Sequence, residues 1–221
     1  MISDNVTILI PTEGDCDSTL SLLTELNEQT DITGTRVIVT DHSDSYEKSK
    51  VRLLQHKDTF TFVLEVVEGS ENVYKSVNGV LDDIETPYFL TLTNGVKFKS
   101  NQTIYNCLVE LKSSDSKIII PKLDIQTSGI IETLVKLKFK SSLKSHPFSP
   151  LSFFFADTEH VIDVGGFVTY QVEIDEEISI CDSFSEDDIY SSNETVVIPN
   201  DMQVVNGYLK RIKEIESVKD I

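Results

Sequence analysis

Short apolar runs and amphipathic stripes alternate along the first 120 residues, and this alternation constrains the fold more than any other feature of the chain. Val6–Pro11 and Tyr88–Leu92 are apolar runs of strand length, whereas Leu20, Leu23 and Leu26 recur at helical spacing. Strands that alternate with helices tend to pair in parallel, because each helix carries the chain back to the edge where the next strand starts. We therefore predict an α/β fold, with a mainly parallel sheet flanked by helices.

The same periodicities place the other elements of this first part. Alternation of apolar and polar positions indicates a strand, and apolar positions three and four residues apart indicate a helix. Further strands are predicted at residues 37–39, 60–66 and 118–120, and helices at residues 18–29, 47–56, 73–84 and 104–111.

The pattern changes after Leu123. Residues 131–139 alternate as in a strand with one wet face, and 153–155 are three consecutive phenylalanines, which are typical of another strand. An amphipathic stripe at 204–215 predicts a C-terminal helix, and the serines and prolines of 141–150 predict a loop. We expect one domain with three segments, at residues 1–123, 124–200 and 201–221.

The charge of the chain excludes two classes of partner. Thirty-seven acidic side chains against nineteen basic ones give a formal net charge of -18 over 221 residues. Such a surface repels the phosphates of nucleic acids and of anionic membranes. We therefore expect no nucleic-acid partner and no membrane insertion, and we interpret most of the charge as a solvated exterior.

Cysteine usage and hydropathy indicate the compartment. Cys16, Cys107 and Cys181 are odd in number and widely spaced, which fits neither a disulfide framework nor a zinc site. No apolar run approaches the roughly 18 residues of a membrane span. The sequence thus predicts a soluble, cytoplasmic protein of unknown oligomeric state.

The segments with chemically useful side chains follow the predicted strands, where ligands of open α/β sheets bind. Pro11-Thr12-Glu13 follows the first strand, Asp41-His42 the second, and Thr93-Asn94-Gly95 the strand at 88–92. Gly165-Gly166-Phe167 and Glu186-Asp187 come later. This order resembles the family-2 inverting nucleotide-sugar glycosyltransferases, which have the GT-A fold, and the resemblance covers residues 5–200.

The resemblance implies where the nucleoside binds. In that family the loop after the first strand and the acids after the second hold the nucleoside, which assigns Pro11, Thr12, Glu13, Asp41 and His42 to nucleotide-sugar binding. The family usually has an aromatic residue and an asparagine in the first loop, where this chain has Glu13 and then glycine, and often a second acid in place of His42. Recognition of a base other than the usual uracil is therefore open. Alternatively, Asp41 begins an ordinary polar turn and His42 is an exposed loop histidine.

Residues 69–79 resemble the family's segment beside the diphosphate, where a helix begins. A helix N-terminus together with a cation suits that anion. By resemblance, Lys75 is the candidate cation and Asn78 a polar partner. The alternative for Lys75 is a solvated helix lysine.

Thr93-Asn94-Gly95 stands where the family has its Asp-x-Asp motif. The resemblance implies that two carboxylates there would hold Mn²⁺ or Mg²⁺ against the sugar diphosphate. This chain has no carboxylate at the three positions, and one neutral asparagine is a poor site for either ion. A divalent cofactor is therefore expected only if other groups supply its ligands; otherwise transfer is metal-free or the site is no longer catalytic.

The later motifs indicate retained chemistry. By resemblance, Gly165, Gly166 and Phe167 form a turn on the acceptor side, and Asp187 accepts the proton of the acceptor hydroxyl while Glu186 helps to orient it. The alternative is that the acids around Asp187 cap a helix. The resemblance also assigns residues 1–123 to donor binding and 124–200 to the acceptor.

Two functions from different classes follow. The first is a glycosyltransferase that moves a sugar from a nucleotide-diphosphate donor to a hydroxyl acceptor with inversion. The second is a non-catalytic GT-A-like domain with a binding or assembly role. A nucleotidyltransferase of similar topology is a third reading, disfavoured because no glycine- and basic-rich loop follows the first strand.

Overall fold

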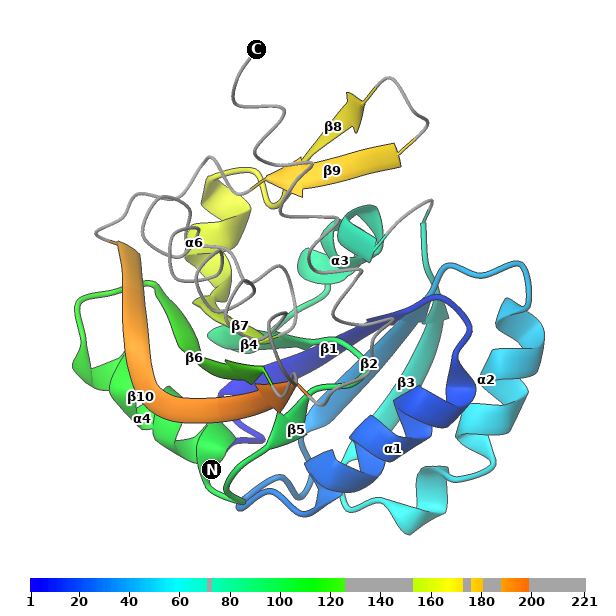
Figure 1. The fold of residues 1–221 in the computed structure, drawn as a ribbon, viewed down its shortest axis with the longest axis horizontal. Helices are drawn as coiled ribbons and strands as arrows, with labels where there is room; N and C mark the ends of the chain where they lie inside the picture. The colour runs from blue at the N-terminus through cyan, green and yellow to red at the C-terminus, as the bar shows by residue number, and fades with distance from the viewer. Residues whose placement is uncertain (71–72, 126–152, 173–175, 181–187, 199–221) are drawn as a thin grey trace, which may run out of the picture.

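The computed structural model describes residues 1–70, 73–125, 153–172, 176–180 and 188–198 (Figure 1). Three sequence predictions lie outside these residues: the strand at 131–139, the loop at 141–150 and the C-terminal helix at 204–215. Among the described helices, none is long and apolar enough to cross a membrane.

Strands and helices alternate through the first part of the chain and become mostly strands afterwards. The strands are β1 (Val6–Thr12), β2 (Arg36–Asp41), β3 (Val63–Glu68), β4 (Tyr88–Leu92), β5 (Lys97–Phe98), β6 (Ile118–Ile125), β7 (Phe153–Asp157), β8 (Val168–Val172), β9 (Glu176–Ile180) and β10 (Ile189–Ile198). The helices are α1 (Cys16–Asn27), α2 (Tyr46–Leu54), α3 (Val73–Leu81), α4 (Thr103–Ser113) and α6 (Thr158–Asp163), with a 3-10 turn, η1 (Lys57–Thr59).

Eight of these strands form one mixed sheet in the order β3-β2-β1-β4-β7-β6-β10-β5. The first four strands of that order are parallel, as are β6 and β10, whereas β7 is antiparallel to both of its neighbours and β5 is antiparallel to β10. The strands β8 and β9 form a separate antiparallel pair. The predicted α/β class with a mainly parallel sheet is confirmed.

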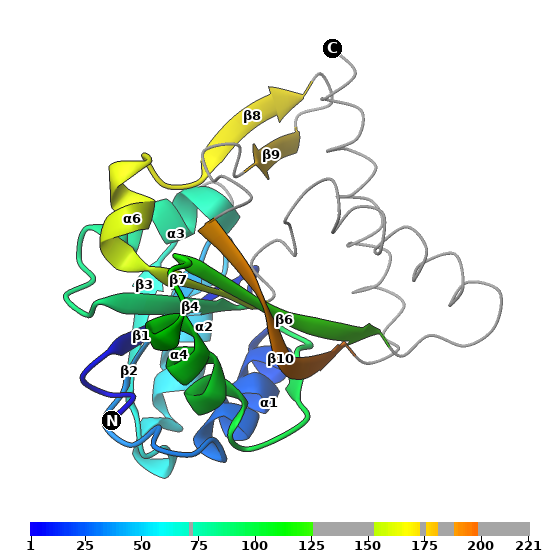
Figure 2. The ribbon, with the colours of Figure 1, turned by 90° about the vertical axis from the view of Figure 1, so that its left-hand side faces the viewer.

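Successive residues of the central strands point to opposite faces of the sheet, and each face has its own apolar cluster. Ile8 and Ile10 pack in one cluster with side chains of α1, α2 and α4, whereas Leu9 packs in the other with side chains of α3 and α6. The sheet is therefore the middle of three layers, with helices on both faces (Figure 2). Such sheets need strands that are apolar on both faces, as β1 and β4 are.

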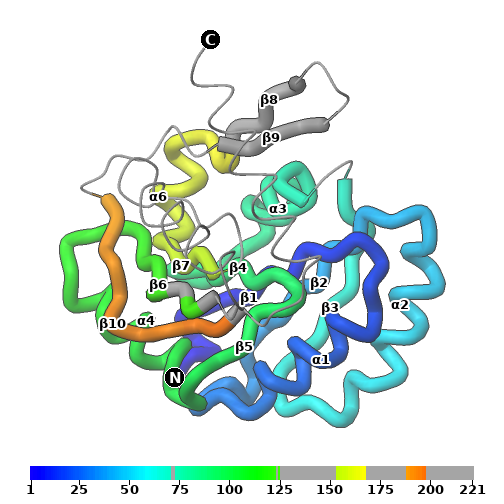
Figure 3. Tube along the Cα trace, in the orientation of Figure 1, coloured from blue at the N-terminus to red at the C-terminus, as the bar shows by residue number. Residues whose placement is uncertain are grey.

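Some predicted boundaries were wrong. The strand predicted at 60–66 begins at Val63, and Phe60 and Phe62 stack before it with ring centroids 4.8 Å apart, so their apolar character reflects side-chain packing ahead of the strand. The strands β5, β8, β9 and β10 and the short helix α6 were not predicted. Figure 3 traces β10 from the side of α6 across to β5, along β6.

Candidate functional site

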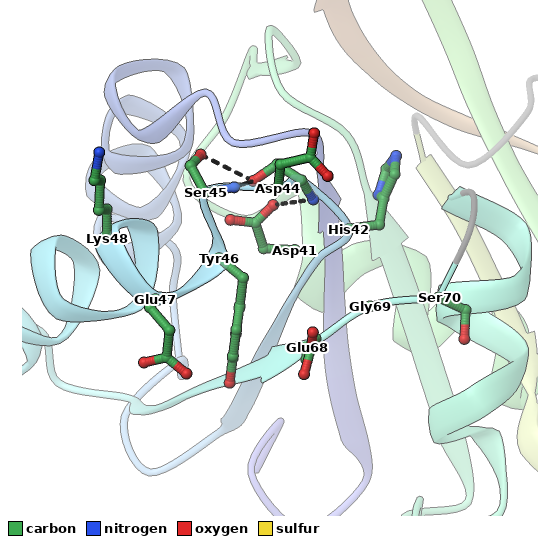
Figure 4. A pocket seen from close by; sticks show the side chains of 11 residues that line it. Asp41, His42, Asp44, Ser45, Tyr46, Glu47, Lys48, Glu68, Gly69 and Ser70 are labelled. Carbon is green, nitrogen blue, oxygen red and sulfur yellow. Dashed lines mark hydrogen bonds between the residues drawn. The ribbon is translucent and has the colours of Figure 1, made fainter.

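A cavity of about 660 Å³ lies at the carboxyl ends of β2 and β3. The loop from β2 into α2 forms one side, and the end of β3 with the residues after it forms the other (Figure 4). We call this cavity the β2–β3 pocket; its lining residues are Asp41, His42, Ser43, Asp44, Ser45, Tyr46, Glu47, Lys48, Glu68, Gly69 and Ser70. The sequence prediction that Asp41 and His42 lie at the carboxyl edge of the sheet is consistent with this position.

Asp41, the last residue of β2, is fully buried at the wall of the pocket. Its Oδ1 accepts a hydrogen bond from the backbone N–H of Ser43 at 2.9 Å, which forms the polar turn expected after a strand. Its Oδ2 is buried and has no hydrogen-bond partner among the described residues. A buried carboxylate oxygen without a donor is costly, so this atom is the most direct indication that a ligand completes the site.

His42 is the second wall residue with an unsatisfied atom. Its side chain is only 10% exposed, and its Nε2 lies 3.5 Å from Glu13 Oε1 in the loop after β1. Its buried Nδ1 has no hydrogen-bond partner within the described part of the chain. The structure therefore brings Glu13 and His42 together, and it makes His42 a wall of the pocket instead of an exposed loop histidine.

Two glycines allow the loops around the pocket to pack closely. Gly14 has φ +88°, and a Cβ atom there would lie 2.8 Å from Ser43 Oγ. A Cβ atom on Gly69 would lie 2.6 Å from Ser76 Oγ and 3.0 Å from the backbone nitrogen of His42. The contact between the ends of β2 and β3 thus requires a glycine at residue 69.

The charge of the pocket is negative. Four of its lining side chains are carboxylates, and its single Lys or Arg side chain, that of Lys48, points away in Figure 4. The carboxylates belong to Asp41, Asp44, Glu47 and Glu68. Such a wall repels phosphate, so the pocket suits an uncharged part of a ligand.

Pro11 and Thr12 are buried in β1 and do not line the pocket. The Oγ1 atom of Thr12 faces α1, where the hydroxyl of Thr19 lies 3.2 Å away. The carbonyl oxygen of Thr12 accepts a hydrogen bond from the backbone N–H of His42 at 3.2 Å. Pro11 and Thr12, which were predicted to bind the nucleoside, are therefore buried beside the pocket, and Thr12 contacts the backbone of the wall residue His42.

Lys75 and Asn78 both lie on α3, but the structure gives Asn78 a clear internal role. Its Nδ2 donates to the Phe167 carbonyl at 2.7 Å, and its Oδ1 accepts from the Phe167 backbone N–H at 2.9 Å. Lys75 is in the first turn of α3, the helix that follows the pocket residues of β3. The structure therefore places Lys75 near the start of α3, and it ties Asn78 to the turn at Gly165–Phe167.

Gly165-Gly166-Phe167 forms a tight turn after α6. Both glycines have positive φ, +90° and +75°, and a Cβ atom on Gly166 would lie 2.7 Å from Asn78 Oδ1. Phe167 is buried and packs edge-on against Phe154 of β7 with ring centroids 5.3 Å apart. The turn predicted as acceptor-side is therefore fixed against α3 and the sheet.

The turn at Thr93-Asn94-Gly95 follows β4 and is tied to α1 and β1. The Asn94 Nδ2 group donates to Thr19 Oγ1 at 3.1 Å and to Thr12 Oγ1 at 3.3 Å. Its Oδ1 is buried and has no hydrogen-bond partner among the described residues, and Gly95 has φ +87°. The Asn94 side chain thus links the turn after β4 to β1 and α1 by hydrogen bonds.

The residues of this turn do not fit a divalent metal ion. Mn²⁺ and Mg²⁺ prefer several oxygen ligands including carboxylates, whereas this turn offers one hydroxyl and one neutral amide that is already held by Thr12 and Thr19. Within the described ranges, no three His, Cys, Asp or Glu side chains group in a way that could hold a metal.

Glu186 and Asp187, the predicted catalytic acids, lie outside the described residues. Their described neighbour Asp188 precedes β10 at its amino end, where its carbonyl accepts from the backbone N–H of Lys117 and its carboxylate lies 3.6 Å from His160 Nε2 on α6. Because β6 and β10 run parallel and start at this edge, Asp188 lies at the opposite edge of the sheet from the β2–β3 pocket. Among the described residues of this acidic segment, Asp188 does not lie beside the pocket.

Most of the lining residues were not singled out from the sequence, and two of these are Glu68 and Tyr46. Glu68 is the register partner of Asp41 across β2 and β3, and Tyr46 begins α2 with its hydroxyl 3.4 Å from the Val66 carbonyl. Glu68 could have been identified by predicting that the strand ending at Asp41 pairs in parallel with the next strand, because both strands then end at the same edge. Nothing in the local sequence of Tyr46 indicates its position at the wall.

No family model matches the chain, and no curated protein matches it. Similar solved structures exist at low identity. The mannosyltransferase PcManGT of Pyrobaculum calidifontis, in complex with GDP-Man and Mn²⁺, aligns with a TM-score of 0.62 and 14% identity over 96% of this chain and 64% of that one. TarS of S. aureus, residues 1–349 with UDP-GlcNAc, aligns with a TM-score of 0.59 and 14% identity over 89% of this chain and 58% of that one.

A third similar structure is glucosyl-3-phosphoglycerate synthase of Mycobacterium tuberculosis in complex with phosphoglyceric acid. It has a TM-score of 0.54 and 11% identity, over 89% of this chain and 70% of that one. The chain thus spans less than two thirds of the length of the first two proteins. At these identities the comparisons establish the GT-A type of fold and leave function to be argued from the site.

Proposed function

We propose that this chain binds a nucleoside diphosphate sugar at the carboxyl edge of its sheet and transfers the sugar to a hydroxyl acceptor. The buried Asp41 carboxylate lies at the wall of a cavity of about 660 Å³, and one of its oxygens has no partner among the described residues; this observation carries the proposal. This oxygen lies at the carboxyl end of a parallel strand, and open α/β sheets bind their ligands at that end of their strands. The three similar structures are of a mannosyltransferase with GDP-Man, of TarS with UDP-GlcNAc and of a glucosyl-3-phosphoglycerate synthase, which supports the same class of donor.

The charges of the site suggest how the donor is oriented. The acid-lined β2–β3 pocket takes the uncharged nucleoside, and the diphosphate extends toward the first turn of α3, where Lys75 lies. The N-terminus of a helix and a lysine both favour an anion. The sugar then points toward the turn at Gly165–Phe167, which Asn78 fixes against the same helix.

In the proposed reaction the acceptor hydroxyl oxygen attacks the anomeric carbon from the face opposite the diphosphate. The carbon–oxygen bond to the diphosphate breaks, the nucleoside diphosphate leaves with the bonding electrons, and the configuration inverts. A carboxylate that accepts the hydroxyl proton completes the step. Asp187 is the proposed base because of its place after the Gly165-Gly166-Phe167 turn in the order of motifs, with Glu186 orienting the acceptor.

The family resemblance and one similar structure suggest a divalent cation, but the residues at Thr93-Asn94-Gly95 do not fit one. We therefore assign no step to a metal. The carboxylates that the family places there would neutralise the leaving diphosphate. In this chain the helix N-terminus and Lys75 are the groups on the donor side that can do so.

The experiment that tests the base is the variant Asp187→Asn, assayed by release of nucleoside diphosphate from a panel of nucleotide sugars. Loss of a general base should lower turnover by about 10²- to 10⁴-fold and leave nucleoside diphosphate affinity unchanged. Asp188→Asn is the matched control, because it removes the neighbouring charge beside His160. Full turnover by Asp187→Asn would remove this residue from the mechanism.

A second function is favoured by one observation, the absence of acidic side chains at Thr93-Asn94-Gly95. A GT-A-like domain that binds a nucleotide sugar without turning it over would need no charge there. In that case the panel of donors would bind and none would be consumed. The binding measurement and the turnover assay therefore separate the two functions.

A further inference from the structure

The wall of the β2–β3 pocket is rich in hydrogen-bond acceptors. Asp41 and Glu68 are register partners at the ends of two parallel strands, so the backbones of these two carboxylate residues lie side by side, about 4.8 Å apart. Like charges at paired positions destabilise a sheet. A ligand that donates hydrogen bonds between them would relieve this cost.

The backbone donors around the pocket are already used within the protein. The N–H of Ser43 donates to Asp41 Oδ1, that of Gly69 to the Asp41 carbonyl, and that of Ser70 to Ser76 Oγ. The N–H groups of three further lining residues are also donated internally, those of His42, Ser45 and Tyr46. The backbone of these residues therefore leaves few donors for a ligand. The remaining donors of the wall are side chains, such as the Ser45 and Ser70 hydroxyls and the His42 imidazole, and they lie beside four carboxylate acceptors.

Among the nucleobases, the acceptor-rich wall favours the one with the most donors on a single edge. Guanine presents N1–H and the N2 amino group next to each other, whereas adenine and cytosine present one amino group beside a ring acceptor. Uracil presents a single N3–H between two carbonyl oxygens, so it offers the carboxylates one donor where guanine offers two adjacent donor groups. Acidic side chains are the acceptors that proteins use for donor groups of bases.

We propose that the β2–β3 pocket selects guanine, with N1–H and the N2 amino group directed at the Asp41 carboxylate, so that the donor is a guanosine diphosphate sugar. This inference rests on the proposed function. The buried Oδ2 gains the partner that it lacks within the described residues, and Oδ1 has a second lone pair besides the one that Ser43 occupies. Glu68 lies next to Asp41 in register and is the second acceptor for the amino group.

The test is isothermal titration of the full chain with GDP, IDP and UDP in the presence of EDTA. IDP differs from GDP only by lacking the 2-amino group, so the pair isolates the contact that the inference assigns to the carboxylates. We expect GDP to bind about tenfold or more tightly than IDP and UDP. Equal affinity for GDP and IDP, or tighter binding of UDP, would overturn the guanine inference and leave the proposed function standing.

The variant Asp41→Asn localises the effect. It should weaken GDP binding about tenfold and reduce the difference between GDP and IDP. Asp44→Asn removes one charge from the exposed rim of the same pocket and should preserve the difference. Thermal melting of both variants checks that they fold. If Asp41→Asn does not fold, the comparison of GDP and IDP binding by the unmodified chain alone tests guanine selection. Absence of binding by all three nucleotides would overturn the inference together with the proposed function.

Discussion

The carboxyl ends of β2 and β4 lie on the same edge of the sheet and differ in what they offer a ligand. At the end of β2, Asp41 has a buried carboxylate oxygen beside an open cavity, and no described residue bonds to that oxygen. At the end of β4, Asn94 uses its amide nitrogen to bind Thr12 and Thr19 and brings no charge. In the proposed function, Asp41 recognises the nucleoside at the end of β2, whereas the turn at Thr93-Asn94-Gly95 after β4 has no carboxylate for a metal ion.

The largest expected effect on stability and nucleotide binding comes from a substitution that crowds the contact between the ends of β2 and β3. Gly69→Ala would place a methyl group 3.0 Å from the backbone nitrogen of His42 and 2.6 Å from Ser76 Oγ, so the pocket wall must shift. We expect a loss of about 2 kcal/mol in the free energy of unfolding and a loss of nucleotide binding of at least tenfold. Chemical denaturation and titration with nucleoside diphosphates measure both quantities.

Gly79→Ala is the matched control for that prediction. Gly79 lies on α3, and a Cβ atom there would meet nothing within 4 Å. The change should stabilise the protein by about 0.5 to 1 kcal/mol, because alanine favours a helix more than glycine does, and should leave binding intact. If Gly69→Ala behaved like Gly79→Ala, the tight approach of the β2 and β3 ends would have no bearing on the site.

The role of Asn78 gives the next largest effect. Asn78→Ala removes two hydrogen bonds and leaves the Phe167 N–H and carbonyl without these partners, which should cost about 2 kcal/mol of stability. Nucleoside diphosphate affinity should change by less than about twofold, since Asn78 acts on the turn and not on the nucleoside. Asn78→Asp keeps the acceptor and should cost less. A large drop in affinity with unchanged stability would instead assign Asn78 to the ligand, as the sequence resemblance implied.

The smallest effects belong to the β4 end. Asn94→Ala should cost about 1 kcal/mol, because its two hydrogen bonds are long, at 3.1 and 3.3 Å. Nucleoside diphosphate affinity should stay within about twofold, or about 0.4 kcal/mol, between EDTA and Mn²⁺, for this variant and for the unmodified chain. A tenfold gain with Mn²⁺ would show that a metal site exists despite the chemistry of this turn.

The fold was predictable where local pattern and burial agree. β4 begins and ends at the predicted residues, because Tyr88–Leu92 is apolar except for Thr91 and is covered on both faces. β10 was missed because polar residues fill its middle, and its pairing with β6 shifts register between Ser191 and Thr195. A strand with such an irregularity has no clean alternation to detect.

The site was predictable only in part, for a physical reason. Asp41 is identifiable because it directly follows an apolar run and therefore must lie at the carboxyl edge. The bonding of Asn78 to Phe167 joins residues 89 positions apart, and it depends on how α3 packs beside the turn after α6. Sequence order also ranks Asp187 as the base, whereas the position of Asp188 at the opposite edge makes this the assignment most in need of experiment.

The most direct test of the account is where a nucleoside diphosphate binds. Backbone amide chemical shifts of the labelled protein, recorded while GDP is added in EDTA, report the site without requiring turnover. The account predicts that the largest changes fall in residues 41–48 and 68–70, with smaller ones in the first turn of α3. Changes centred on the amino ends of β6 and β10, or no change at saturating nucleotide, would contradict it.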